Sequence, residues 1–330
     1  MGNIDVNDAN HKHATYWERK GDEAARAAGY ELDSAAAGQK YQKAADDFNK
    51  AARALDRAGD RKNAAWDYER AAWQLEHKGD LKGAAHYLEK AGADITNDLS
   101  KKNDLRRDVQ AERDYSEAGE DRMNAGKAAG RNHKEAAKQY GEAERDFTKA
   151  ADADARISIG TSDDIKNIEK YNTKAALARE KAAAEAGEDH MDAGKAAGRN
   201  HKEAAKQYGE AEADFSKAAG RSGNVDDIKK YYTKADHAGE KAAAAAGEDH
   251  MDAGKAAERH HNHKEAANQY GQAHDDFTKA AVLARKAGDT EDADKYDKQA
   301  DDAGKKAAKE ETLVKPKDAL PAHINPKNRL

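Results

Sequence analysis

The chain has no cysteine and almost no proline. The absence of cysteine excludes a disulfide framework, a thiol nucleophile and a zinc–thiolate site. The prolines, Pro316, Pro321 and Pro326, all lie at the C-terminal end of the sequence. Because proline breaks helices by removing a backbone donor, its absence before residue 316 leaves long helices uninterrupted.

Large apolar residues are also scarce. Leucine, isoleucine, valine and phenylalanine make up 29 of the 330 residues, whereas alanine alone contributes 75. Such a low content of large apolar residues is typical of disordered chains, but alanine is the best helix former. We therefore expect an all-α protein with a thin, alanine-lined core. No long apolar run is present, so we expect no membrane-spanning segment.

The charges nearly cancel and are interleaved along the chain. The sequence has 58 basic and 64 acidic residues, which gives a formal net charge of −6. Interleaved charge is typical of solvated helix faces and argues against a nucleic-acid partner. Residues 1–6 lack the basic and apolar regions of a cleaved signal peptide. We expect the protein in the cytoplasm, or secreted without a cleaved signal as a bacterial effector.

A unit of twenty residues recurs in the N-terminal third. Segments 44–48, 64–68 and 84–88 each begin with two alanines, and a Gly-Asp pair precedes the last two segments, at 59–60 and 79–80. Glycine in the left-handed conformation ends a helix, and aspartate accepts amide hydrogen bonds that start the next. These pairs predict tight corners between antiparallel helices.

Longer duplicated units follow. Residues 125–144 and 193–212 are identical, and a third copy begins at Ala253 with two inserted residues. Each unit predicts a shorter helix, as over 201–220, and a longer one, as over 225–258 or 163–198. Each shorter helix follows an asparagine with glutamate three residues later, which resembles a capping box. These asparagines are Asn132, Asn200 and Asn262.

Aromatic residues and glycines lie at helical spacing in these units. We interpret the aromatic pairs as core between helices, the alternative being a row that faces a ligand. The pairs are Tyr140 and Phe147, Tyr208 and Phe215, and Tyr270 and Phe277. Close packing would explain the helical glycines, which are Gly119, Gly126, Gly141 and Gly209. Gly187 and Gly194 weaken the helix over 163–198, so bends are expected there.

Composition and repeats together divide the chain into four regions. They are a flexible N-terminus over 1–13, helices of twenty-residue period over 14–110, three longer duplicated helical repeats over 111–311, and a proline-containing, disordered tail over 312–330.

The Gly-Asp corners carry a resemblance to a known family. Gly59-Asp60 is followed by Ala64, Tyr68 and Ala71. The same pattern reads Gly79-Asp80, Ala84, Leu88 and Ala91. A third instance, Gly288-Asp289, Ala293 and Ala300, has its aromatic residue one position early, at Tyr296. It resembles the second-helix half of a tetratricopeptide repeat. The runs DAGKAA at 192–197 and EAAKQY at 203–208 look like the soluble NSF attachment proteins, a branch of that superfamily.

The resemblance implies a fold and a function. Members of the superfamily stack antiparallel helix pairs into a right-handed solenoid and hold a partner peptide or helix on one face. It therefore implies a non-enzymatic scaffold or adaptor whose partner is a protein. The attachment proteins clasp helical membrane-fusion bundles and recruit an ATPase through a leucine-rich C-terminal end, which this chain lacks.

Two groups of residues are candidate binding sites. His190 with Asp192, and His250 with Asp252, place imidazole and carboxylate close together on a helix, but a metal prefers ligands four residues apart on one face. We therefore expect no metal and no other cofactor. Trp66 and Trp73 lie seven apart, and Trp66 is two residues from the Ala64–Tyr68 stripe. This offset predicts an exposed anchor for a protein partner.

No pattern for catalysis is visible. The few serines lie in expected turns, as at Ser158, Ser162 and Ser222, without a base beside them, and no glycine-rich phosphate loop follows a strand. We expect no enzyme. Two alternatives to the adaptor stay open: a secreted bacterial effector that mimics such an adaptor, and a structural rod in which the duplicated helices are spacers.

Overall fold

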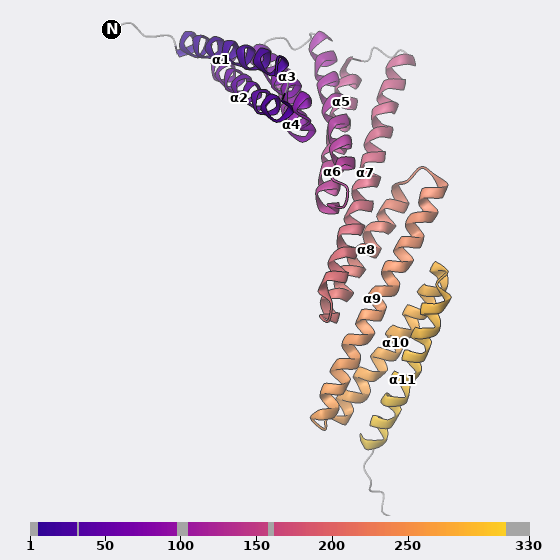
Figure 1. Ribbon diagram of the computed structural model, residues 1–330. Coiled ribbons are helices and arrows are strands. Elements are labelled where there is room, and N and C mark those ends of the chain that lie inside the picture. Colours follow the sequence, from indigo (N-terminus) through magenta and orange to yellow (C-terminus); the bar gives the residue numbers. More distant parts are fainter. Residues whose placement is uncertain (1–5, 32, 98–104, 158–161, 315–330) are drawn as a thin grey trace, which may run out of the picture. The chain divides into compact units, whose positions relative to one another are not determined.

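The computed structural model describes residues 6–31, 33–97, 105–157 and 162–314. These ranges form eleven helices and contain no strand, which confirms the predicted all-α class (Figure 1). The helices are α1 (Val6–Gly29), α2 (Ser34–Ala58), α3 (Arg61–Lys78), α4 (Leu81–Asn97), α5 (Leu105–Ala128), α6 (His133–Ile157), α7 (Ser162–Ala197), α8 (His201–Arg221), α9 (Val225–Arg259), α10 (His263–Ala287) and α11 (Thr290–Val314).

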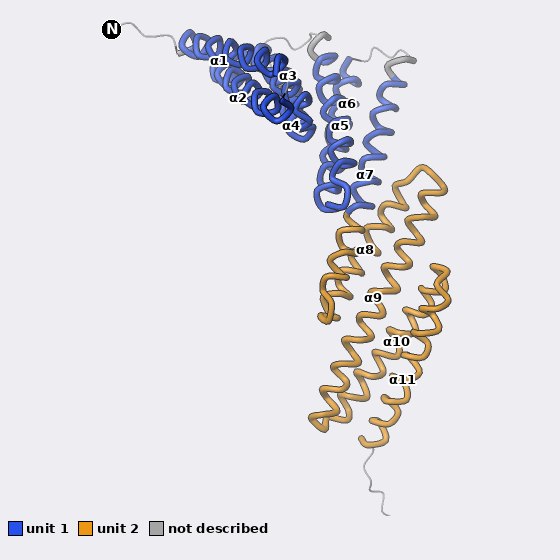
Figure 2. Tube along the Cα trace, in the orientation of Figure 1, with its two compact units in different colours: residues 1–185 blue, residues 186–330 orange. Residues whose placement is uncertain are grey.

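The helices group into two compact units (Figure 2). Unit 1 covers residues 1–185 and unit 2 covers residues 186–330, so the boundary lies within α7. In unit 1 each of α1 to α5 packs on the next helix in the chain, and in unit 2 each of α8 to α10 does the same. Helix-after-helix packing of this kind is the architecture of a helical repeat array.

The predicted Gly-Asp corners are present. Gly59 adopts a left-handed φ of 79°, and Gly79 one of 84°. Each donates its backbone N–H to carbonyls of the helix that it ends, as Gly59 does to Asp56. Asp60 then accepts a hydrogen bond of 3.3 Å from the Asn63 N–H. The corner therefore supplies hydrogen-bond partners for backbone carbonyls at the end of α2 and for a backbone N–H at the start of α3.

The predicted capping boxes are only half formed. Asn200 accepts a hydrogen bond of 3.2 Å from the Glu203 N–H, as a cap should. The Glu203 carboxylate, however, accepts from Gln207 at 2.7 Å instead of returning to Asn200. The reason is that the Asn200 N–H already donates to the Ala197 carbonyl at 3.0 Å. The copies at Asn132 and Asn262 show the same arrangement.

Five of the six predicted aromatic side chains are buried in the core and Tyr208 is half-buried, and glycines make room for all six. In three helix pairs, two glycines seven residues apart on one helix face two rings on the next. Gly119 faces Phe147 and Gly126 faces Tyr140; Gly187 faces Phe215 and Gly194 faces Tyr208; Gly247 faces Phe277 and Gly254 faces Tyr270. Each ring fills the space that a Cβ would occupy, so helix and ring approach more closely than any other residue type would allow.

α7 is a single helix through Gly187 and Gly194, as predicted for 163–198, and both glycines make room for the facing rings. One expectation about glycine is corrected by this packing. Gly141 and Gly209 have no described neighbour within 4 Å of the Cβ position, so close packing does not explain them.

Three predicted region boundaries do not coincide with helix ends. α1 begins at Val6, so helix covers most of the predicted flexible N-terminus. Just beyond that region, in the same helix, Ala14 is buried and Trp17 packs against the core. The predicted boundary at residue 110 falls inside α5, and α11 continues to Val314, three residues into the predicted tail. The rest of that tail, 315–330, lies outside the described residues.

Candidate partner-binding face and buried charge network

Trp66 and Trp73 both point away from the core of unit 1. Trp66 is 61% exposed and Trp73 is 51% exposed. The core stripe of α3 instead carries Ala64, Tyr68 and Leu75, all buried. Residues seven apart complete nearly two helical turns, so the tryptophans lie on one face, about 10 Å apart along the axis.

Trp73 is held by neighbouring rings. The imidazole of His77 lies 3.8 Å from the Trp73 ring, centroid to centroid. His77 Nδ1 is 2.8 Å from the Trp73 carbonyl oxygen, and Tyr41 of α2 contacts the His77 ring at 5.8 Å. Sequence analysis missed Tyr41 and His77. His77 could have been found from its spacing, because residues four apart on a helix, such as Trp73 and His77, lie next to each other.

The structure separates the candidate metal-ligand pairs. His190 Nδ1 lies 3.1 Å from Asp214, and His190 Nε2 lies 3.5 Å from Glu210, both on α8. Asp192 instead pairs with Lys195 at 3.0 Å. The imidazole therefore joins α7 to α8 and is not paired with the carboxylate two residues away.

The second copy repeats this arrangement. His250 lies 2.7 Å from Asp276 of α10, while Asp252 pairs with Lys255 at 2.9 Å. His201 Nε2 also lies 3.8 Å from Asp252. Across the described ranges, no group of three or more histidine, aspartate or glutamate side chains is placed to hold a metal ion.

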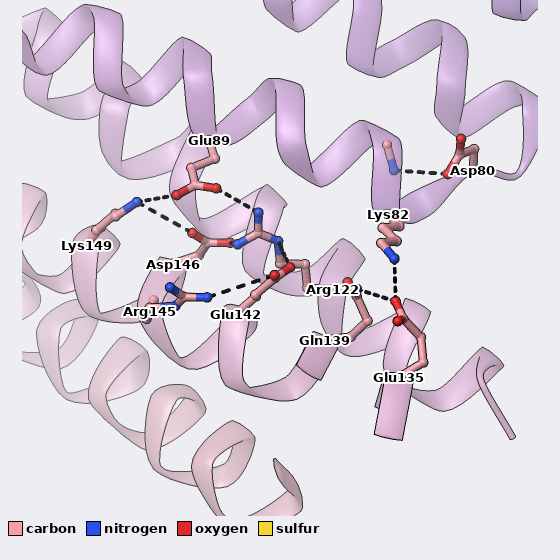
Figure 3. A network of polar contacts seen from close by, with 11 residues as sticks. Asp80, Lys82, Glu89, Arg122, Glu135, Gln139, Glu142, Arg145, Asp146 and Lys149 are labelled. Carbon is pink, nitrogen blue, oxygen red and sulfur yellow. Dashed lines mark hydrogen bonds and ion pairs between the residues drawn. The ribbon is translucent and has the colours of Figure 1, made fainter. Parts of the chain in front are cut away.

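Arg122 occupies the position that His190 and His250 hold in the later copies, and it is the centre of a buried charge network (Figure 3). Its side chain, on α5, is only 6% exposed, and it lies 2.7 Å from Asp146 of α6. It also lies 2.7 Å from Glu89 of α4 and 3.5 Å from Glu142. One guanidinium thus joins three helices.

Lys149 completes the network. Its ammonium lies 2.6 Å from Glu89 and 4.0 Å from Asp146. Although burial acts to raise the pKa of Glu89, the hydrogen bonds from Lys149 and Arg122 lower it to about 2. Glu89 therefore stays ionised at neutral pH. The network ties α4 to α5 and α6, and it contains no group poised as a nucleophile or base.

No protein-family model matches the chain, and no curated protein matches it. A solved circular tandem repeat protein with novel repeat topology is 13% identical, with a TM-score of 0.33, over 91% of this chain and 65% of that one. A computationally designed, self-assembling cyclic homooligomer is 16% identical, with a TM-score of 0.28, over 92% of this chain and 98% of that one.

The helices of the described residues, their sequential packing and the sequence repeats define an all-α helical repeat protein. The tetratricopeptide and attachment-protein resemblance stays a prediction from the sequence, because no family model supports it. Among the described helices, none combines the length and apolarity that crossing a membrane requires.

Proposed function

We propose that the protein is a non-enzymatic scaffold that binds a helical segment of another protein on the outward face of α3, through Trp66 and Trp73. Tryptophan side chains are frequent binding hot spots because each buries a large apolar area on contact. A partner helix lying along α3 would meet both rings with apolar side chains seven residues apart. The partner is a protein and not a nucleic acid, met in the cytoplasm or after secretion.

The exposed tryptophans are the observation that carries this proposal. Leaving two large aromatic rings in water loses the hydrophobic free energy of their burial, and the core of unit 1 does not use them. Trp73 is also held by His77, so less side-chain entropy is lost when a partner binds.

The test compares capture by three full-length proteins. The wild type, the Trp66→Ser/Trp73→Ser double variant and the Tyr232→Ser variant are immobilised and exposed to native lysate, and bound proteins are identified by mass spectrometry. Tyr232 is the matched control because it is also 51% exposed, but lies on α9 in unit 2.

A true partner binds the wild type and the Tyr232→Ser variant, and is lost from the double variant. The same partner, once purified, raises the melting temperature of the wild type, since a ligand that binds only the folded state stabilises it. Circular dichroism of the double variant checks that its helices are intact. If all three proteins capture the same partners equally, the partner does not bind through Trp66 and Trp73.

A further inference from the structure

Acidic side chains of α3 face acidic side chains of the helices on both sides of it. The clearest case joins α3 to α5 through Gln110. Its amide nitrogen donates to Glu69 at 2.9 Å and to Asp114 at 3.0 Å. Two carboxyl groups that contact one nitrogen atom lie within about 6 Å of each other. Asp114 is almost completely buried, and its Oδ2 has no hydrogen-bond partner in the described ranges.

The basic groups near this pair do not neutralise it. Arg113 is the cation that acts on both carboxyl groups, but its guanidinium is 2.9 Å from Glu117, which adds a further negative charge. Burial raises the pKa of Asp114 to about 8, and the nearby Glu69 adds to the effect.

A second pair joins the same two helices. Asp121 of α5 lies within hydrogen-bonding reach of Glu76 of α3, and Glu117 and Glu120 add negative charge. His77 is the nearby group of opposite sign that acts on Glu76. Burial, followed by these carboxylates, raises the pKa of Asp121 to about 7. Asp121 Oδ2 is buried and accepts no hydrogen bond from the described residues.

A third pair joins α3 to α1. Asp67, almost completely buried, lies within hydrogen-bonding reach of Glu18. Arg70 donates to Asp67 Oδ1 at 3.3 Å but also bonds to Asp22, so its charge is shared. Asp67 Oδ2 accepts no hydrogen bond in the described part of the chain. Burial, with Glu18, raises the pKa of Asp67 to about 7.

Three contacts between alternate helices in unit 2 each join one carboxylate to one donor, rather than to a second carboxyl group. Lys234 of α9 contacts Glu188 of α7, and Gln299 of α11 donates to Glu248 of α9 at 2.8 Å. Lys309 and Glu258 are 3.1 Å apart. In these pairs a donor meets each carboxylate, so ionisation favours the contact.

We propose that α3 is held between α1 and α5 by pairs of acidic side chains that keep one proton per pair, so that a rise in pH through neutrality loosens α3 within unit 1. In the pairs of Asp67 with Glu18 and Asp121 with Glu76, the protonated carboxyl donates to its ionised partner. In the pair of Glu69 with Asp114, Gln110 lies between the two groups, and the proton removes one of two buried negative charges. Loss of the proton leaves two carboxylates that repel each other in each pair.

The direction of the pH dependence follows from the raised pKa values. A carboxyl group with a higher pKa in the folded state binds its proton more tightly there than in the unfolded state. The resulting stabilisation is complete below the unfolded value near pH 4. It is lost as the pH rises through 7 to 8, the folded values of Asp67, Asp121 and Asp114.

Tryptophan fluorescence makes the test specific to this region. The three tryptophans of the chain, Trp17, Trp66 and Trp73, lie on α1 and α3, so their emission reports on those helices alone. Urea unfolding of the full chain is followed by fluorescence and by circular dichroism at about pH 5 and about pH 9, on either side of the titration window.

We expect the unfolding equilibrium constant seen by fluorescence to be at least about tenfold larger at the higher pH, since one pKa unit corresponds to tenfold. The Asp114→Asn/Asp121→Asn variant, whose amides mimic protonated carboxyls, loses the part of that difference that comes from these two pairs and keeps the part from Asp67 and Glu18. The Glu248→Gln variant in unit 2 keeps the whole difference. If the double variant does not fold, Glu69→Gln provides the same comparison. A fluorescence transition equally stable at both pH values, or a pH difference as large in the amide variant as in the wild type, would overturn the proposal.

Discussion

Gly187 of α7 lies directly beneath the ring of Phe215 of α8: a Cβ atom on Gly187 would be 2.8 Å from Cε1 of Phe215. Phe215 is buried, so its ring has little freedom to move away. The same contact joins Gly119 to Phe147 and Gly247 to Phe277. In a protein with so few large apolar residues, these ring-on-glycine contacts are the main places where a bulky side chain fills the space between two helices.

The Gly187→Ala variant should therefore be less stable than the wild type by about 1–3 kcal/mol, the usual range for overpacking a core. Gly209→Ala is the matched control, because Gly209 also lies within a helix but has no described atom within 4 Å of its Cβ position. Alanine there should stabilise the protein by about 0.5–1 kcal/mol through helix propensity. Urea unfolding measures both. The packing explanation fails if the two substitutions shift stability in the same direction.

Asn200 gives a second prediction. Its side chain caps α8 by accepting the Glu203 N–H, so Asn200→Ala should cost about 1 kcal/mol and Asn200→Gly only a few tenths. Thermal melting of the two variants distinguishes loss of the cap from a general effect of mutation at this corner. Equal losses for alanine and glycine would mean that the side-chain cap does not contribute.

Local signals in the sequence predicted much of this fold. The Gly-Asp and asparagine corners fix helix ends through hydrogen bonds between residues two to five apart, and the structure places α8 and α9 within a residue of their predicted bounds. The stripe of Ala64, Tyr68 and Ala71 predicted the buried face of α3. Because Trp66 is two residues away from this stripe, the stripe also predicted that Trp66 lies off the buried face of α3.

Contacts between distant helices could not be predicted in the same way. Arg122 pairs with Glu89, 33 residues earlier, and His190 pairs with Asp214, 24 residues later. Such partners depend on which helix packs beside which, and the sequence offers many other acids at similar helical spacing. For a similar reason, the half-formed capping box at Asn200 was not predictable. The Asn200 N–H donates to the Ala197 carbonyl in the preceding turn, so it is not available to the Glu203 carboxylate.

Arg122 provides a third prediction. Arg122→Ala should destabilise unit 1 by about 3–5 kcal/mol, because it leaves the ionised Glu89 and the buried Asp146 without the cation that joins them. Arg145→Ala is the control: Arg145 is largely exposed and lies 3.9 Å from Glu142, so its removal should change stability by less than about 0.5 kcal/mol. Urea unfolding followed by circular dichroism compares the two. Similar losses for both arginines would contradict a special role for the buried one.

Glu240 should give unit 2 a pH dependence of the opposite sign to that of the α3 carboxyl pairs. It is completely buried, and Tyr296 donates to it at 3.0 Å while His237 lies 3.1 Å away. Burial acts to raise the pKa of Glu240, but the hydrogen bonds from His237 and Tyr296 outweigh it and lower the pKa below the ordinary value of 4.5. Its stabilisation is therefore complete above that value and is lost as the pH falls through the folded pKa.

Tyr296→Phe tests this directly, because it removes one donor and leaves the ring in place. A hydrogen bond to a charged group contributes about 1.5–3 kcal/mol, so the variant should lose about that much stability at neutral pH. The loss should shrink in acid, where Glu240 becomes protonated in both proteins and the hydrogen bond is no longer charge-assisted. Tyr232→Phe, at an exposed tyrosine of the same unit, should change nothing. Thermal melts of both variants from acid to neutral pH provide the measurement, and a loss for Tyr296→Phe that grows on acidification would show that Glu240 is not held as the carboxylate.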